Sequence, residues 1–400
     1  MLKTLKEIPN LKNKRILLRC DFNVPIKSKG RGLKSKIKIT NSLKIDSALS
    51  TIRYLQKQGA VIIIASHMGR PMGHIKKELS LFPVAKYLSK KLYQEIIFVE
   101  DFLDINFAKA TKEFKSGEVI LLENLRFHAG EENNSITFAK KIARLADLYV
   151  NDAFAVSHRN HTSLSAITKC LPSYAGLSLE QEVETLSHVL ENRRQPTLAV
   201  IGGAKIATKI SVINNIAKKA DLIIIGGALA NNFIKAIGYE VGKSIINKDY
   251  IKSARELLNH KEFGKKIIIP FDARVGGGIE SPRKATWRRL DQIKKDEYIL
   301  DIGPRTQHLY SKLARNAGSI IWNGPMGFYE NKYFRQGTYA VANAIARSRA
   351  HSIVGGGETL DILKNLSLTK KIDFVSTGGG AMLDFLSGKD LPGIKPLIKK

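Results

Sequence analysis

Short apolar runs alternate with segments of helical periodicity along the whole chain. In the first half, runs rich in valine, isoleucine and leucine predict strands over Arg15–Arg19, Val61–Ala65, Val119–Leu122 and Leu148–Asn151. In the second half, the same signal predicts strands over Leu198–Ile201, Leu222–Ile225, Ile320–Trp322, Ser352–Val354 and Phe374–Val375. Helical spacing predicts helices over Asn41–Gln58, Leu81–Leu92, Ile136–Leu145 and Ser178–Leu190. Strands that alternate with helices predict the α/β class, with parallel sheets and crossover helices.

The chain is too long for one ordinary core. Its 400 residues suit two domains of about 200 residues each. The residues that follow the predicted strands change from arginine to glycine near residue 178, so we place one domain at residues 1–177 and the other at 196–385. A connecting helix then occupies residues 178–195, and a tail with two prolines and several lysines occupies 386–400.

In the first half, each predicted strand runs into a polar tip with an arginine. These arginines are Arg19, Arg70, Arg126 and Arg159, and each has asparagine, histidine or aspartate nearby. In an open α/β sheet, ligands bind outside the carboxyl ends of the strands. A cluster of guanidinium groups at one such edge favours a small anion with several charges.

In the second half, each predicted strand runs into glycines. The glycine tips are Gly202-Gly203, Gly226-Gly227, Gly324-Pro325, Gly355–Gly357 and Gly378–Gly380. Bare backbone lets phosphate groups approach amides closely. Lys205 and Lys209 share one face of the helix predicted after the first pair, where ammonium groups and the helix dipole act together on phosphate. The sequence therefore predicts two half-sites for two phosphorylated molecules.

Carboxylates are scarce at these strand tips, and we find no acid–base pair. The two candidates are Glu330 and Glu358. One of them could hold Mg²⁺ through a bound nucleotide, and the other could hold a ribose.

Several familiar motifs are absent or incomplete. Gly238–Ser244 resembles a P-loop but has three residues between its glycines instead of four, so we reject it. Neither a dinucleotide fingerprint nor a nucleophile elbow occurs. His158 and His161 are spaced like two metal ligands on a helix, but with no third ligand nearby we expect hydrogen bonding or substrate contact instead.

The sequence has no membrane-spanning signal. It has no apolar stretch of about 18 residues or more, and its start lacks the apolar region of a secretory signal. Its two cysteines, Cys20 and Cys170, cannot build a disulfide framework. We therefore expect a cytoplasmic protein in a reducing compartment.

The formal net charge of +29 allows two interpretations. Nucleic-acid binding is one, but the lysines are scattered and lack the interleaved aromatic residues of a single-strand binder. Anionic substrates on a generally basic chain are the other, and we favour this one. The stretch from Lys27 to Lys38 carries six positive residues and no acid. We expect a solvated surface loop there, and the alternative is a flap that attracts anions.

Eight motifs, in order along nearly the whole chain, resemble phosphoglycerate kinase. The most specific are Asp-Phe-Asn-Val-Pro at residues 21–25 and Ser-His-Met-Gly-Arg-Pro at 66–71. The other six are Glu-Asn-Leu-Arg-Phe-His at 123–128, Asn-Asp-Ala-Phe at 151–154, Gly-Gly-Ala-Lys at 202–205, Trp-Asn-Gly-Pro at 322–325, Gly-Gly-Gly-Glu-Thr at 355–359 and Ser-Thr-Gly-Gly-Gly at 376–380. The resemblance implies a monomer of two Rossmann-like domains, each a parallel sheet flanked by helices, joined by a hinge helix, with the tail returning to the N-terminal domain.

The resemblance also implies the reaction: 1,3-bisphosphoglycerate and ADP give 3-phosphoglycerate and ATP, reversibly and with Mg²⁺. It places the glycerate substrate on Asp21, Phe22, Asn23, Lys44, His67, Met68, Gly69, Arg70, Arg126 and Arg159. It places the nucleotide on Lys209, Gly226, Gly227, Asn323, Glu330, Gly355, Gly356, Gly357, Glu358 and Thr359, with Glu358 also the expected metal ligand. Lys44, Lys205, Gly379 and Gly380 would face the transferred phosphoryl group.

This chain departs from the family pattern at four places. Lys44 stands where the family carries an arginine that contacts the transferred phosphoryl, and lysine lacks the two-pronged donor. We hypothesise that Lys44, or Arg31 from the basic stretch, partly substitutes for it. Glu358 stands for a usual aspartate, Ala155 replaces a usual glycine, and the basic stretch contains an insertion.

The leading hypothesis is an active glycolytic kinase. The alternative is a protein of the same fold with reduced activity that binds nucleic acid or another polyanion. A kinase for a different small acid is disfavoured, because the N-terminal tip motifs match in full apart from Lys44 and Ala155.

Overall fold

The chain folds into two compact units. The computed structural model describes residues 1–29, 36–279 and 284–399. Unit 1 comprises Met1–Glu184 and Asp390–Lys400, and unit 2 comprises Thr185–Lys389. The boundary falls inside helix α6 (Leu177–Glu191), the segment that the sequence predicts as the connecting helix.

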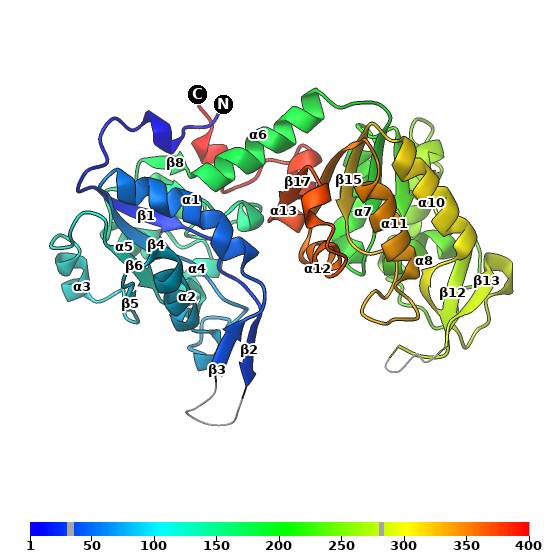
Figure 1. The fold of residues 1–400 in the computed structure, drawn as a ribbon, viewed down its shortest axis with the longest axis horizontal. Coiled ribbons are helices and arrows are strands. Elements are labelled where there is room, and N and C mark those ends of the chain that lie inside the picture. The colour runs from blue at the N-terminus through cyan, green and yellow to red at the C-terminus, as the bar shows by residue number, and fades with distance from the viewer. Residues whose placement is uncertain (30–35, 280–283, 400) are drawn as a thin grey trace. The chain divides into compact units, whose positions relative to one another are not determined.

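Unit 1 contains a six-stranded parallel sheet in the order β5-β6-β4-β1-β7-β8 (Figure 1). The strands are β1 (Arg15–Arg19), β4 (Val61–Ala65), β5 (Ile97–Val99), β6 (Val119–Leu122), β7 (Leu148–Asn151) and β8 (Ser173–Ala175). The four strands predicted from the sequence are confirmed with the predicted bounds. Strands β5 and β8 were not predicted; they are three residues long and lie at the two edges of the sheet.

Helices cover both faces of this sheet. They are α1 (Leu43–Lys57), α2 (Phe82–Leu92), α3 (Ile105–Ala110), α4 (Ala129–Glu132) and α5 (Ile136–Ala143). Ile16 and Leu18 of β1 pack in one cluster with α1 and α2, whereas Leu17 packs in the opposite cluster with α5. Successive strand residues point to opposite faces, so a sheet that is covered on both sides needs the continuous apolar runs seen here.

The basic stretch forms a hairpin over its described residues, so the prediction of a loop was wrong there. Strand β2 (Ile26–Lys29) pairs antiparallel with β3 (Lys36–Ile39), with Lys27 opposite Lys38. Isoleucine and lysine alternate along β3, which is the period-two signal of a strand; the charge of the stretch obscured it. Figure 1 shows the hairpin projecting from unit 1. Arg31 lies outside the described residues.

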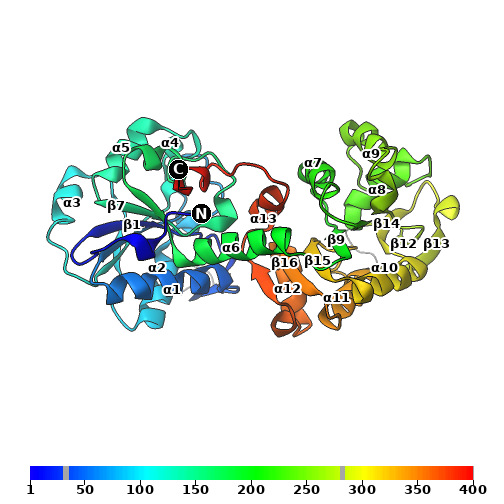
Figure 2. The same cartoon turned by 90° about the horizontal axis from the view of Figure 1, so that it is seen from above.

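The C-terminal segment Asp390–Lys400 belongs to unit 1. The Asn151 side chain donates a hydrogen bond from Nδ2 to the Gly393 carbonyl at 2.8 Å. Leu2 forms a bridge with Ile398, so the two ends of the chain lie side by side (Figures 1 and 2).

Unit 2 contains a second six-stranded parallel sheet, in the order β11-β10-β9-β15-β16-β17. The strands are β9 (Thr197–Ile201), β10 (Leu222–Ile225), β11 (Ile267–Ile268), β15 (Ser319–Asn323), β16 (His351–Gly355) and β17 (Phe374–Ser376). All five predicted strands are confirmed to within one residue at each end. The prediction of two α/β sheet domains is therefore correct as a fold class.

The helices of unit 2 again lie on both faces of the sheet. They are α7 (Ile206–Ile216), α8 (Gly227–Ala236), α9 (Ile251–Leu258), α10 (Pro304–Asn316), α11 (Gln336–Ala346), α12 (Gly357–Asn365) and α13 (Gly379–Leu386). Figure 2 shows α7 and α8 on the side opposite α10, α11 and α12. The latter three pack on Val200, Trp322 and Val354 of the sheet.

A small antiparallel sheet, β13-β12-β14, was not predicted. Its strands are β12 (Asp272–Gly276), β13 (Thr286–Arg289) and β14 (Tyr298–Ile302). Across the part of the chain that the structure describes, no helix has both the length and the apolar character needed to cross a bilayer.

Candidate active site

The arginine tips of unit 1 meet at one edge of its sheet because β1, β4, β6 and β7 are parallel. Each strand delivers its polar residues immediately after its last apolar residue. Asn23 accepts a hydrogen bond from the Gly69 amide through Oδ1 at 3.0 Å, which ties the tip after β1 to the tip after β4. Gly69 has φ of +61°, and a Cβ there would lie 2.7 Å from Leu79. The residues predicted to bind the glycerate substrate are thus brought together from distant parts of the sequence.

A buried ion pair joins the first tip to helix α1. The Lys44 ammonium lies 2.6 Å from Asp21 Oδ2. Asp21 is 5% exposed, and the Lys44 side chain is 31% exposed. Burial alone would raise the pKa of Asp21, but the Lys44 ammonium, through its charge and its hydrogen bond, and the Asn23 amide outweigh it and hold that pKa well below its usual range. Lys44 therefore neutralises an ionised carboxylate in the half-site, and its own side chain is partly exposed.

His67 is held neutral. Burial lowers the pKa of His67 well below its usual value; the Asp21 carboxylate opposes this shift, and Arg19, Arg126 and Lys44 add to it. Phe22 and Met68, which flank these polar residues, are buried in the same core. The imidazole is therefore a hydrogen-bonding group near neutral pH, not a cation.

The strongest indication of an anion site is a set of buried nitrogens without partners. Arg126 is 2% exposed, and its Nη1 donates to the Gly69 carbonyl at 2.6 Å. Arg126 Nε and Nη2, Arg159 Nε and His161 Nδ1 have no hydrogen-bond partner among the described residues, although Arg126 Nε lies 3.3 Å from a Glu132 oxygen as an ion pair. Buried donors of this kind are costly unless a ligand satisfies them.

The pKa shifts agree with a site that awaits a negative charge. Burial lowers the pKa of Arg126 to about 10. Burial, followed by Arg126 and Arg159, lowers the pKa of His161 to about 4. Burial and then Arg70 lower the pKa of Arg159, although Arg70 itself is exposed. The positive groups destabilise one another, and an anion among them would relieve that repulsion.

His158 and His161 lie in a turn between Val156 and Leu164, not on a helix. The two histidines therefore do not form a pair of metal ligands on a helix. Among the described residues no group of three or more histidine, cysteine, aspartate or glutamate side chains could hold a metal ion.

In unit 2 the glycine tips allow the backbone segments to approach one another closely. A Cβ at Gly202 would lie 2.1 Å from the Pro325 carbonyl oxygen. Gly227 has φ of +63°, and a Cβ there would lie 2.4 Å from the Gly203 amide nitrogen. A Cβ at Gly226 would lie 2.5 Å from Met326 Sδ. These positions exclude any larger residue, so the glycines are required by close packing at the ends of β9 and β10.

The loops after β15, β16 and β17 are joined by Asn323. Its Nδ2 donates to the Gly355 carbonyl at 2.8 Å and lies 3.4 Å from the Gly379 carbonyl. The Gly324 amide donates to Thr359 Oγ1 at 2.8 Å. Gly356 has φ of +106°, and a Cβ on Gly379 would lie 2.5 Å from the Gly356 Cα. Gly357 and Gly379 begin α12 and α13, and Gly380 follows in the first turn of α13.

Lys209 and Glu358 both lie next to Gly203. A Cβ on Gly203 would be 3.0 Å from Lys209 Nζ and 3.5 Å from Glu358 Oε2. The Lys209 ammonium donates to the Gly202 carbonyl. Burial lowers the pKa of Lys209 to about 8, while Glu358 opposes the shift. A buried lysine beside bare glycine backbone is suited to binding phosphate.

A cavity of about 270 Å³ adjoins these residues. Gly227, Glu330 and Glu358, three of the predicted nucleotide residues, line it. Its apolar lining was not predicted and includes Ile245, Ile299, Leu300 and Phe328. Ile299 and Leu300 come from β14, so the small antiparallel sheet, which was not predicted, forms one wall of the cavity. Burial raises the pKa of Glu330, and the nearby Glu358 adds to the shift.

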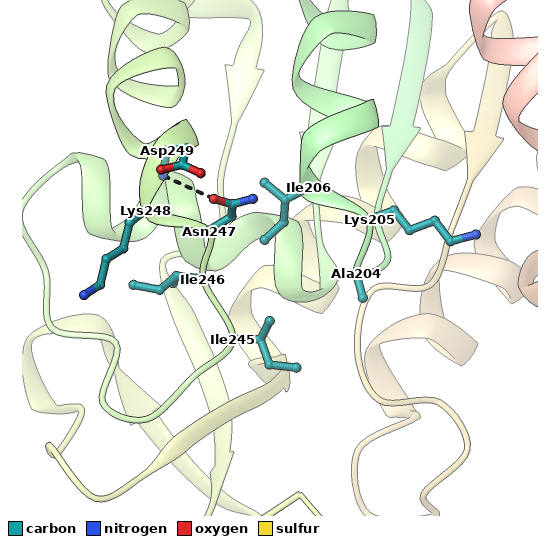
Figure 3. Close-up of a pocket in the computed structure, with 8 residues that line it drawn as sticks. All are labelled: Ala204, Lys205, Ile206, Ile245, Ile246, Asn247, Lys248 and Asp249. Carbon is teal, nitrogen blue, oxygen red and sulfur yellow. Dashed lines mark hydrogen bonds between the residues drawn. The ribbon is translucent and has the colours of Figure 1, made fainter.

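A larger groove of about 580 Å³ lies at the start of α7. It is lined by Ala204, Lys205, Ile206 and the segment from Ile245 to Asp249. Figure 3 shows the Lys205 side chain extending away from Ile245 and Ile246. Ala204 and Ile245 line both hollows, so the groove continues the cavity toward Lys205.

Two open parallel sheets thus carry, at the carboxyl ends of their strands, a cluster of buried arginines in unit 1 and glycine loops beside a buried lysine in unit 2. This combination is typical of a phosphotransferase. A family model for phosphoglycerate kinase matches residues 5–389. The phosphoglycerate kinase of Moorella thermoacetica is 43% identical over 398 residues, which cover 99% of each chain. The solved structure of phosphoglycerate kinase from Coxiella burnetii is 41% identical with a TM-score of 0.82 and 99% coverage of both chains. That from Pyrococcus horikoshii is 33% identical with a TM-score of 0.85, covering 99% of this chain and 98% of the other.

The chain belongs to the phosphoglycerate kinase family, the glycolytic phosphotransferases with a carboxyl group as acceptor. The family and fold predicted from the sequence are confirmed.

Proposed function

We propose that the two half-sites divide the family reaction between them, with 3-phosphoglycerate in unit 1 and the adenine nucleotide in unit 2. The observation that supports this assignment is the set of unpartnered buried nitrogens on Arg126, Arg159 and His161. A phosphate or carboxylate would accept hydrogen bonds from the guanidinium groups with a geometry that lysine cannot match. Asn23, His67 and Arg70 would complete the contacts to the glycerate.

In the direction that consumes ATP, a carboxylate oxygen of 3-phosphoglycerate attacks the γ-phosphorus. The bond from that phosphorus to the β,γ-bridging oxygen breaks, and ADP leaves. The carboxylate is already ionised near pH 7, so no general base is required. Catalysis then consists of positioning and charge neutralisation. We assign these tasks to Lys44, Lys205 and the amides of Gly379 and Gly380.

We assign the adenine and ribose to the cavity of about 270 Å³ and the phosphates to Lys209 and the glycine loops. Mg²⁺ would be held mainly by the nucleotide phosphates and water, with Glu358 as its protein ligand. A single carboxylate suits this ion, because Mg²⁺ usually keeps several waters and is bound through one or two carboxylates plus phosphate. The ion supplies charge neutralisation to the phosphoryl group when it is bound.

We further propose that the chain acts as a monomer in the cytoplasm. Because separate units hold the two substrates in this proposal, transfer requires the units to bring them together, and exclusion of water would prevent hydrolysis.

A coupled assay with 3-phosphoglycerate, ATP and Mg²⁺ tests the assignment. Turnover should be abolished by Lys209→Ala and should require Mg²⁺. If turnover is absent in the native chain while nucleic-acid binding survives Lys209→Ala and weakens steeply with salt, the polyanion-binding alternative is favoured.

A further inference from the structure

A buried polar chain runs behind the half-site of unit 1. Arg19, at the end of β1, is 1% exposed, and its Nε donates to Ser163 Oγ at 2.7 Å. Ser163 Oγ in turn donates to Glu131 Oε1 at 2.6 Å, and the Ser163 amide donates to Glu131 Oε2 at 3.0 Å. Glu131 has no exposed surface. Both carboxylate oxygens of Glu131 are thus occupied by one residue.

The direction of these hydrogen bonds is fixed by chemistry. A guanidinium group can only donate, and an ionised carboxylate can only accept. Ser163 has a single hydroxyl proton, so it must accept from Arg19 and donate to Glu131. The bridge therefore places the Glu131 charge one hydroxyl away from the Arg19 charge and locks the guanidinium plane.

The other end of Arg19 determines the state of His67. Arg19 Nη1 donates to the Cys20 carbonyl, and Nη2 lies 3.3 Å from His67 Nδ1. Since Nη2 can only donate, His67 Nδ1 must be the acceptor and the ring proton must reside on Nε2. His67 lies at the tip after β4, among the residues assigned to the glycerate substrate.

We propose that Glu131 and Ser163 are positioning residues that act through Arg19 to hold His67 in the neutral tautomer with its proton on Nε2, ready to donate to the glycerate substrate. This inference rests on the proposed function for its effect on substrate affinity, but its effect on the His67 ring does not depend on turnover. Neither residue touches the substrate in this proposal. Their effect should therefore be confined to the half-site of unit 1.

Ser163→Ala is the direct test. It leaves the Arg19 Nε donor and one Glu131 oxygen unpartnered, so Arg19 loses its fixed orientation. We expect the KM for 3-phosphoglycerate to rise about tenfold, because a misplaced hydrogen bond of this kind costs on that order. The KM for ATP should be unchanged. In ¹⁵N spectra of the imidazole, native His67 should show one tautomer between pH 6 and pH 8, whereas the variant should show a mixture.

Ser163→Thr and Glu131→Gln complete the design. Ser163→Thr retains the hydroxyl and should give the native His67 spectrum, unlike Ser163→Ala. If Ser163 served only to fill space, the presence of the hydroxyl would not determine the His67 spectrum. Glu131→Gln preserves the shape, removes the charge and covers the case in which Ser163→Ala fails to fold. Ser165→Ala is the matched control, since Ser165 lies in the same segment, is half-buried and, in the described structure, forms its hydrogen bonds through its backbone amide and carbonyl.

The outcomes separate this inference from the proposed function. A native chain without turnover, but with a His67 tautomer that depends on Ser163, would refute the function and support the inference. Normal turnover with an unchanged KM for 3-phosphoglycerate and an unchanged His67 spectrum in Ser163→Ala and Glu131→Gln would overturn the inference alone. An equal loss of affinity for both substrates would also overturn it, because it would indicate general destabilisation.

Discussion

Replacement of Lys44 by alanine should leave a buried carboxylate without its counter-charge. The Lys44 ammonium lies 2.6 Å from Asp21 Oδ2, and Asp21 is only 5% exposed. Removal of one partner of a buried ion pair costs about 3 kcal/mol; we take the low end of the usual range because the Lys44 side chain is partly exposed. The free energy of unfolding of Lys44→Ala should fall by this amount at pH 7.

The pH dependence of the unfolding free energy is a sharper test of this ion pair. The pKa of Asp21 is held well below its ordinary value. The pair therefore stabilises the fold above the unfolded carboxyl pKa of about 3.9, and this stabilisation is lost as the pH falls toward the lower folded pKa. In the variant, burial without Lys44 raises the pKa of Asp21, so the acid is protonated on folding. The difference in stability between native chain and variant should narrow as the pH falls from 7 to 4.

Urea unfolding at several pH values measures both the loss of unfolding free energy and its dependence on pH. Lys395→Ala is a matched control, because Lys395 also lies 2.6 Å from a carboxylate, that of Asp390, but both side chains are well exposed. Exposed pairs contribute roughly 0–1 kcal/mol, so this control should change little. A stabilising role of the Lys44–Asp21 pair is refuted if Lys44→Ala destabilises the fold no more than the control does. It is also refuted if the loss of unfolding free energy in Lys44→Ala stays constant from pH 4 to pH 8.

Three further predictions concern the half-sites. Arg126→Ala should abolish the thermal stabilisation by 3-phosphoglycerate and leave that by ATP intact, whereas the exposed Arg53→Ala should change neither. Gly227→Ala should weaken ATP binding and lower the melting temperature more than Gly117→Ala. Both glycines have positive φ, but only Gly227 has atoms within 4 Å of the added Cβ. An equal fall in melting temperature in the two variants would contradict the requirement for close packing at Gly227. Lys209 has a pKa of about 8, so the KM for ATP should rise as the pH passes from 7 to 9, and Lys209→Arg should flatten that profile.

Lys44→Arg addresses the departure from the family pattern. Arginine would restore a two-pronged donor at this position, and a sharp rise in turnover would mean that the native lysine limits the rate. Unchanged turnover in both Lys44→Arg and Lys44→Ala would exclude a catalytic role for Lys44 here, whatever its effect on stability.

The central strands were predictable because they are buried on both faces. Val61–Ala65 reads as one uninterrupted apolar run, and its bounds in the structure are those predicted. Edge strands such as Ile267–Ile268 are too short to give any periodic signal. The small antiparallel sheet was not predicted because Asp272 and Arg274 interrupt the apolar pattern of its first strand. Asp272 is buried and serves the start of α10 instead, accepting hydrogen bonds from the amides of Arg305 and Thr306.

The residues at the strand tips could be predicted, but their partners could not. Parallel strands end at a common edge, so sequence position after a strand is enough to gather His67 and Arg126. The hydrogen bond between Arg19 and Ser163 joins residues 144 positions apart, and Ser163 lies in a turn without a strand signal. Contacts of this kind depend on how irregular segments pack over the edge of the sheet, and no periodicity in the sequence reports on that.

The distribution of charge, and not its total, distinguishes the two half-sites. The chain carries a net charge of +29, yet the cavity assigned to the nucleoside is lined by Asp272, Asp301, Glu330 and Glu358 and by no described lysine or arginine. Burial raises the pKa of Asp301 to about 8, and burial with Glu358 raises the pKa of Glu330, so the described lining of the cavity offers no positive charge that would attract a polyanion. A nucleotide can place its uncharged base there and its phosphates beside Lys209. In unit 1 the guanidinium nitrogens without hydrogen-bond partners are buried, so an extended polyanion that lies on the surface would not contact them. Local charge and burial together therefore favour two small substrates over a nucleic acid.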